Sequence, residues 1–268
     1  MARMQRFASR RRWREGTVHR IWAKVATVAL ASIPASFPAI AQDASAPLSR
    51  AETLLFESDH LAGVAPPAVL VYRFDKVSNV EPGFSDTVRL DLAGSKGKVS
   101  ATLHFLTGKN RHELPALDEA HGNPVLLGFL ERDIAEMKRL TGGSTAYFRK
   151  RIRMALAQEA RVTPQSVTYQ GRALAAHAVH IQPYLDDPLH ARFEPYVNKT
   201  YTFIISERVP GGVYQLRSAL ANRGRSAPGA VVAEVVAATP APKVLPEIDE
   251  TLTLVGVTEG KGGHAHSR

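Results

Sequence analysis

The densest group of charged residues lies between residues 131 and 153. Its basic members Arg149, Lys150 and Arg153 fall within five positions of a segment whose apolar residues recur at helical spacing. Cations placed in this way on the exposed side of a helix suit an anionic surface. The head groups of a phospholipid or lipopolysaccharide would provide one, and so would an acidic partner protein. These three residues are our candidate binding residues.

The same cluster also has a purely structural interpretation. Acids of a first helix would meet bases of a second across a helical hairpin, in exposed pairs that contribute about 0–1 kcal/mol each. Two charged residues four positions apart, Arg132 and Glu136, are expected to pair along their own helix. The residues assigned to structural ion pairs are Glu131, Arg132, Glu136 and Arg151, of which Glu131 and Arg151 are expected to be partly buried.

Residue patterns that would indicate catalysis are scarce. Glu131 and Asp133 would act as an acid/base pair only in one cleft, yet two residues apart on a helix they point to different sides. A hydrolase would need His104 or His112, which flank a polar turn, to converge with carboxylates. The sequence holds no G-x-S-x-G elbow and no phosphate-binding glycine loop. We therefore assign no catalytic residue and keep an envelope hydrolase as an alternative.

No cofactor is predicted, and metal ligation is expected only in the tail. The chain has no cysteine, which excludes disulfides and zinc–thiolate sites. His177 and His180 lie three apart on a predicted strand, so they project to opposite faces and do not share a metal easily. The pair His264 and His266 would bind copper, nickel or zinc weakly, because nothing around it fixes the geometry.

The first 41 residues have the parts of a secretory signal peptide. A stretch rich in arginine runs to Lys24, an apolar run follows, and the small-residue site Ala39-Ile40-Ala41 ends it. The apolar run is short and broken by two prolines, so it is not a comfortable membrane span of about 20 residues. We predict cleavage near Ala41 and a periplasmic or secreted location, by a Sec or a Tat route. A mitochondrial transit peptide is the rival interpretation.

Removal of this leader changes the charge of the protein. The full chain has 34 basic and 25 acidic residues, but 8 of the bases and 1 of the acids precede residue 42. The remainder carries 26 bases against 24 acids, a net charge of +2. Nucleic-acid binding requires basic charge on the folded domain, so the overall +9 does not indicate it.

Hydrophobic periodicity predicts an α+β fold. Period-two alternation marks strands near 70–75, 87–92 and 99–105, and again from 167 to 216. Period-four spacing marks a helical hairpin at about 123–160, with Asn123 and Ser144 as N-caps. Short turns join the strands, which favours a curved, mainly antiparallel sheet with the helices packed on one face. Further segments are expected to form an N-terminal helix (51–61), two last strands (230–237 and 250–257) and a disordered tail (259–268).

The domain organisation is thus a signal peptide (1–41), one domain (42–258) and the tail. This order of elements resembles the periplasmic lipoprotein-carrier superfamily, whose members have a curved antiparallel half-barrel with helices over an apolar, lipid-binding hollow. The resemblance spans most of the mature chain but includes no motif, so it assigns no residue a role. It implies a non-enzymatic binding or carrier protein for an apolar or amphipathic envelope ligand. The alternatives are an envelope hydrolase and an assembly partner that binds an anionic surface through Arg149–Arg153.

Overall fold

A computed structural model describes residues 47–95, 97–221 and 245–260 of the chain. The predicted signal peptide and most of the predicted tail, with His264 and His266, lie outside these residues. So does the strand that we expected at 230–237.

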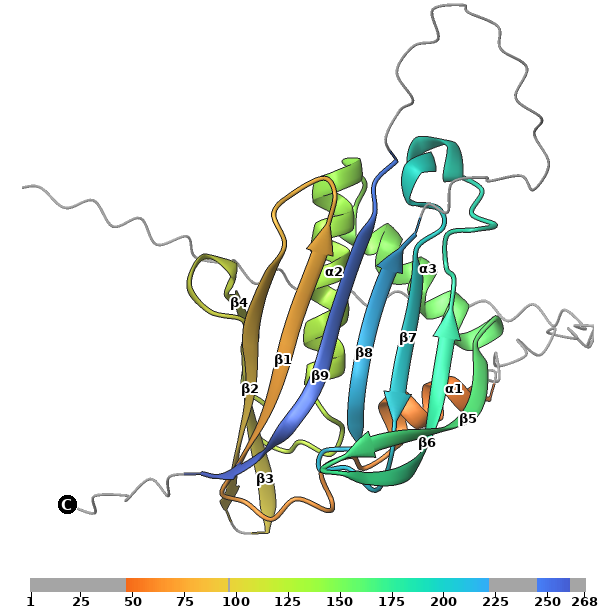
Figure 1. Ribbon diagram of the computed structural model, residues 1–268. Helices are drawn as coiled ribbons and strands as arrows, with labels where there is room; N and C mark the ends of the chain where they lie inside the picture. The colour runs from red at the N-terminus through yellow and green to blue at the C-terminus, as the bar shows by residue number, and fades with distance from the viewer. Residues whose placement is uncertain (1–46, 96, 222–244, 261–268) are drawn as a thin grey trace, which may run out of the picture. The chain divides into compact units, whose positions relative to one another are not determined.

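The described residues build one curved, unclosed sheet with helices on one of its faces (Figure 1). Every pair of neighbouring strands is antiparallel, and the order across the sheet is β4-β3-β2-β1-β9-β8-β7-β6-β5. The predicted α+β class is therefore confirmed. The strands are β1 (Ala68–Ser78), β2 (Phe84–Ser95), β3 (Lys98–Phe105), β4 (His112–Glu113), β5 (Arg161–Tyr169), β6 (Arg172–Ile181), β7 (Thr200–Ile205), β8 (Val213–Leu220) and β9 (Ile248–Glu259).

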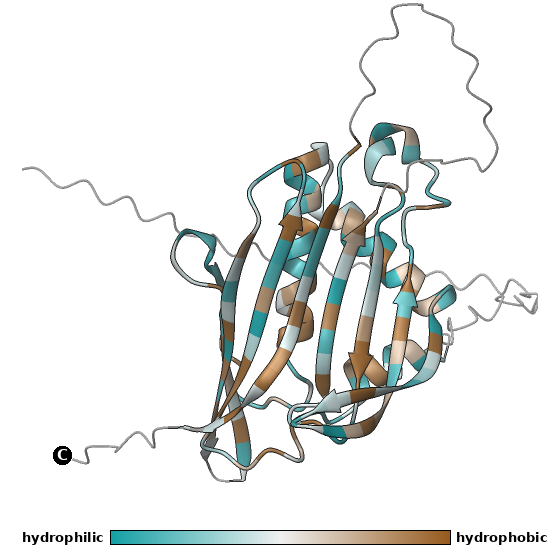
Figure 2. Ribbon diagram, in the orientation of Figure 1, coloured by the Kyte–Doolittle hydropathy of each residue, from teal (hydrophilic) through white to brown (hydrophobic). Residues whose placement is uncertain are grey.

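Alternation of apolar and polar residues determines which face of each strand is buried. In β1, Leu70, Tyr72 and Phe74 are fully buried toward the helices, while Arg73 between them is exposed on the open face. The same alternation runs along other strands (Figure 2). A strand with one dry and one wet face is stable only if something covers the dry side. Here the helical hairpin covers it.

The helical hairpin consists of α2 (Val125–Thr141) and α3 (Thr145–Gln158), close to the predicted range. The side chain of Ser144 accepts from the backbone N–H of Tyr147 at 3.1 Å, so the predicted N-cap of α3 is confirmed. The N-cap of α2 is Pro124 rather than the predicted Asn123, whose side chain still accepts from the backbone N–H of Val125 at 3.1 Å. Gly142 ends α2 at a left-handed φ of 71°, a conformation that other residues rarely adopt. The link is tight, and the helices consequently pack side by side.

The N-terminal helix is shorter than the predicted 51–61. It consists of α1 (Arg50–Glu52) followed by a π-turn, η1 (Thr53–Glu57), and the chain leaves the helix at Ser58. Beyond it the chain forms turns up to β1. Three single 3₁₀ turns complete the described helical structure, and these are η2 (Gly108–Asn110), η3 (His190–Arg192) and η4 (Glu194–Tyr196).

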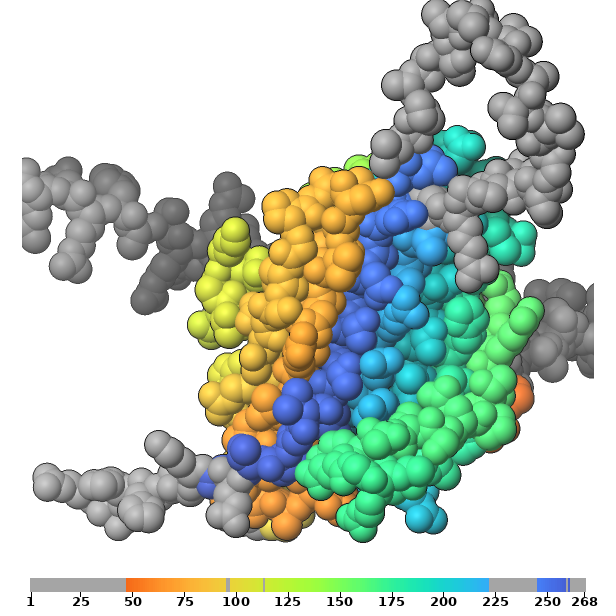
Figure 3. All heavy atoms as spheres, in the orientation of Figure 1, coloured from red at the N-terminus to blue at the C-terminus, as the bar shows by residue number. Residues whose placement is uncertain are grey.

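The two edge strands of the sheet are protected from further strand pairing in different ways. Beyond β3, the segment that follows β4 covers the edge through a pair of backbone hydrogen bonds between Ala101 and Leu117. At the other edge, β5 contains Pro164, which has no N–H to offer to another strand. The β5–β6 hairpin also curls back, and the hydroxyl of Tyr214 in β8 donates to the Thr168 carbonyl in β5 at 3.0 Å. Figure 3 shows this hairpin over the lower part of the open face.

Side chains fill the space between the helical hairpin and the sheet. The bulkiest of the fully buried residues come from both layers, and the aromatic ones are Tyr72, Phe74, Phe105, Phe129, Phe148, Tyr184, Tyr201 and Phe203. Together with the buried aliphatic side chains they form one hydrophobic core between the two layers. A ligand site must therefore be sought at the surface of the described domain.

Candidate functional site

The three candidate binding residues lie together around one depression on α3. Arg149, Lys150 and Arg153 line a space of about 400 Å³, with Met154 and two alanines of the same helix. Glu52 of α1 closes one side, where it accepts a hydrogen bond from the backbone N–H of Ser49 at 2.9 Å. The depression, hereafter the basic depression, thus combines cations with a small apolar floor.

Arg149 differs from the other two cations because it has an acidic partner. Its Nε and Nη2 donate to the two oxygens of Glu131 in α2 at 2.7 and 2.6 Å. The hydrogen bond from Arg149 lowers the pKa of Glu131, and the charges of Arg149 and His112 lower it further against the opposing effect of partial burial. This pair across the hairpin is the structural interaction that we expected for Glu131.

Lys150 and Arg153 are both exposed. Within the described residues neither has a hydrogen-bond or ion-pair partner. Two cations on adjacent turns of one helix, neither bound to an acid within the described residues, attract anions to this part of the surface. The basic depression is therefore one part of the described domain where an anionic ligand would find free positive charge beside apolar side chains.

Arg132 does not pair with Glu136 as the sequence suggested. Its Nη1 donates instead to Glu250 of β9 at 2.6 Å, and its guanidinium lies 4.7 Å from the ring centroid of Phe74. Glu136 is bound by Arg139, three residues later, at 2.5 Å. The expectation was wrong because it treated this helix face as solvated, whereas Arg132 lies at the contact with the sheet. Arg132 therefore forms an ion pair, as expected, but with Glu250 instead of Glu136.

Arg151 is a structural residue, as predicted. Its side chain is only 14 % exposed, and its Nε lies 2.9 Å from a carboxylate oxygen of the buried Asp187. Its Nε and Nη2 also donate to the carbonyl of Pro183 at 3.2 and 3.1 Å. The hydroxyl of Tyr147 donates to Asp187 as well, at 2.5 Å, and burial together with this hydrogen bond raises the pKa of Tyr147 to about 12. Arg151 therefore anchors α3 to the loop after β6.

A buried polar cluster that the sequence analysis missed lies beneath α2. Asp133 is fully buried and accepts from Tyr201 at 2.6 Å and from Ser218 at 2.8 Å, while the Lys199 ammonium lies 2.6 Å from it. The hydroxyl of Tyr184 approaches that of Tyr201 at 3.1 Å. Asp133 falls on the apolar stripe of its helix, which is the signal that could have revealed its burial. Glu131 and Asp133 point to different sides, as predicted, so they do not form an acid/base pair.

A second ionic group continues this cluster toward the surface. Glu250, which is almost fully buried, binds Arg132 and also lies 3.1 Å from the ammonium of Lys76. Lys76 in turn lies 2.6 Å from Glu81. Burial alone would raise the pKa of Glu250, but the charges of Arg132, Lys199 and Lys76 outweigh that effect and lower it. Charges paired in this way hold α2 in one position on the sheet.

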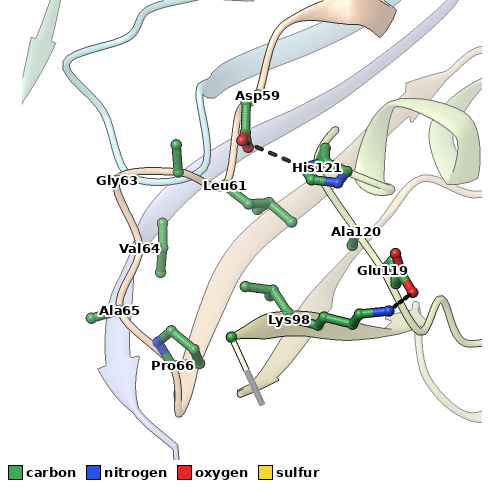
Figure 4. Close-up of a pocket in the computed structure, with 13 residues that line it drawn as sticks. Asp59, Leu61, Gly63, Val64, Ala65, Pro66, Lys98, Glu119, Ala120 and His121 are labelled. Carbon is green, nitrogen blue, oxygen red and sulfur yellow. Dashed lines mark hydrogen bonds and ion pairs between the residues drawn. The ribbon is translucent and has the colours of Figure 1, made fainter. Parts of the chain in front are cut away.

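Another depression, of about 520 Å³, lies between residues 59–66, the start of β3 and residues 119–121 (Figure 4). Its floor is apolar, and two ion pairs stand on its rim. Asp59 lies 3.5 Å from the His121 ring, and Lys98 is bound to Glu119. These four side chains are half-exposed or more, and each contacts its partner on the rim.

The histidines that a hydrolase would need do not approach a described depression. His104 lies on the open face of the sheet, where its Nε2 is 3.3 Å from a carboxylate oxygen of Asp91. His112 lies in the short edge strand β4 opposite Phe105. Neither lines the basic depression or the one in Figure 4. His177 and His180 project to opposite faces, as predicted, since His180 contacts Thr202 on the open face.

Among the described residues, no group of three or more histidine, aspartate and glutamate side chains is placed to hold a metal ion. In the same part of the chain no helix is long and apolar enough to cross a membrane. The chain matches no protein-family model, and no curated protein matches it at a significant level. The fold defines the class of protein, an α+β domain with an antiparallel sheet. Its function has to be argued from the surface.

Proposed function

We propose that this chain is an exported, non-enzymatic binding protein that holds an anionic, amphipathic envelope ligand in the basic depression of α3. The observation that carries the proposal is the convergence there of Arg149, Lys150 and Arg153, two of them without an acidic partner within the described residues. The apolar floor favours a lipid over a free ion. We propose that the head group of such a lipid lies on α3.

The charge of the basic depression sets the expected strength of binding. A lysine or arginine close to an anionic membrane contributes about 1 kcal/mol, and the contribution decays over a Debye length of about 8 Å at physiological salt. Lys150 and Arg153 together should then supply about 2 kcal/mol, which is roughly a 30-fold change in affinity. Binding should weaken steeply as salt is added.

Vesicle binding by the protein without its leader tests this proposal. Vesicles of phosphatidylcholine with about one lipid in four replaced by phosphatidylglycerol should bind the protein, and pure phosphatidylcholine vesicles should not. The double variant Lys150→Gln/Arg153→Gln should lose most of this binding. A matched control, Lys109→Gln/Lys138→Gln, removes the same charge from exposed lysines outside the depression and should bind almost normally.

Two results would contradict the proposal. Equal losses in both double variants would mean that net charge alone drives binding, with no contribution from the depression. Binding to an acidic protein but not to anionic vesicles would favour the envelope assembly partner instead. Circular dichroism should show that both variants remain folded, because the four substituted side chains are exposed.

A further inference from the structure

The contact between Arg149 and Glu131 has the geometry of ligand binding. Two parallel N–H groups of the guanidinium point at two oxygens of one carboxylate, at 2.7 and 2.6 Å. Arginine binds two oxygens of a phosphate group in the same side-by-side arrangement. Glu131 thus occupies the donors that a head-group phosphate in the basic depression would use.

We propose that Glu131 is an internal competitor, whose carboxylate a lipid phosphate displaces from Arg149 when the ligand binds. This inference rests on the proposed function and adds both the ligand group, a phosphate, and the control of its affinity. Lys150 and Arg153 make the first contacts with the head group. Arg149 joins them only after it leaves Glu131, so part of the binding free energy is spent on breaking that pair.

The exposure of the pair makes this exchange feasible. The side chains of Arg149 and Glu131 are 44 % and 33 % exposed, so water can solvate Glu131 once Arg149 turns away. The buried pair of Asp133 and Lys199 has no such route, because both side chains are almost fully enclosed. Exposed pairs are weak, which keeps the competition modest and reversible.

The variant Glu131→Gln tests the competition. It removes the charge but keeps the size of the side chain, and it should bind phosphatidylglycerol vesicles about two- to five-fold more tightly than the wild type at low salt. Glu194→Gln, at an exposed acid on η4, makes the same change in net charge and should bind as the wild type does. Unchanged or weaker binding by a folded Glu131→Gln protein would overturn the inference while leaving the proposed function intact.

A double-mutant comparison separates competition from simple charge removal. If Glu131 holds Arg149 back, Arg149→Gln should reduce affinity more in the Glu131→Gln background than in the wild type. Equal losses in the two backgrounds would show that Glu131 acts only through its charge, and would refute the competition. This comparison also remains informative if Glu131→Gln lowers stability, since both proteins compared in that background carry the variant.

An experiment with inorganic phosphate tests whether the bound phosphate group belongs to a lipid or to a soluble molecule. Under the proposal, vesicles bind and inorganic phosphate alone competes with them only weakly. Saturable binding of inorganic phosphate without vesicle binding would overturn the lipid assignment and point to a soluble phosphate ester. A wild-type protein that binds neither probe would overturn both the proposed function and the inference that rests on it.

Discussion

The substitution Asp133→Asn should severely destabilise the fold, because it leaves a buried ammonium without its counterion. Asparagine has the size of aspartate and can still accept from Tyr201 or Ser218. It has no charge to balance Lys199, whose side chain is 3 % exposed. Breaking one partner of a buried ion pair typically costs about 3–5 kcal/mol. In a domain of this size each kcal/mol lowers Tm by about 2–4 °C, so the expected fall is roughly 6–20 °C.

Urea unfolding followed by circular dichroism is the appropriate assay. The midpoint should fall while the dependence on urea stays the same, because the surface exposed on unfolding does not change. The double variant Asp133→Asn/Lys199→Met removes both charges and should recover most of the lost stability. At the open face, Asp249→Asn breaks the exposed pair with Arg217 and should cost about 0–1 kcal/mol.

A loss below about 1 kcal/mol for Asp133→Asn would refute this reasoning. Such a value would mean that Lys199 gives up its proton or reaches water in the variant. Equal stabilities of the single and the double variant would refute it as well, since the penalty is assigned to the unpaired ammonium.

Three further perturbations test how α2 and α3 are held. Gly128→Ala should destabilise the fold by about 1–3 kcal/mol in thermal melts, because the added Cβ would lie 2.7 Å from Leu103 and 2.8 Å from Phe105. An unchanged Tm would show that α2 can shift at no cost in free energy. Ser144→Ala should cost about 1 kcal/mol by the same measurement, since it removes the N-cap of α3, and Ser144→Thr should restore most of it. The pKa of Glu250 is lower in the folded state than the unfolded value of about 4.3, so its contribution to the free energy of unfolding is complete above that pH and is lost as the pH falls through the folded pKa. In urea unfolding between pH 3 and 6, the free energy of unfolding of Glu250→Gln should therefore fall less steeply with acid than that of the wild type. Identical slopes would contradict the lowered pKa.

Local patterns predicted the elements well, because they depend on neighbouring residues. The N-cap at Ser144 follows from side-chain chemistry within one turn, and it was found. The cap of α2 was placed one residue early, at Asn123 instead of Pro124. The grouping of Arg149, Lys150 and Arg153 was foreseeable for the same reason, since helical spacing alone places them on one face. The N-terminal helix was overestimated, since its apolar spacing continues beyond Glu57, where the chain leaves the helix.

Interactions between distant segments could not be predicted in this way. Arg132 seemed matched to Glu136, but Glu250 of β9 is its partner, and no spacing rule connects residues so far apart. The burial of Asp133 had a signal in its helix stripe, yet its partner Lys199 lies in the loop just before β7. Choosing such partners requires the order of strands in the sheet, and that order is set by contacts across the whole chain.

The position of β9 has a consequence for how the protein is made. The last strand lies between β1 and β8 and pairs with both, so it joins one half of the sheet, β1–β4, to the other half, β5–β8. Until β9 pairs, the two halves leave β1 and β8 without a partner on their inner edges. Pairing of β1 with β9 must also bring together residues from nearly opposite ends of the described chain. Such non-local pairing is slow. The sheet is therefore completed only when β9 pairs with both halves, which we expect to be a late step in folding.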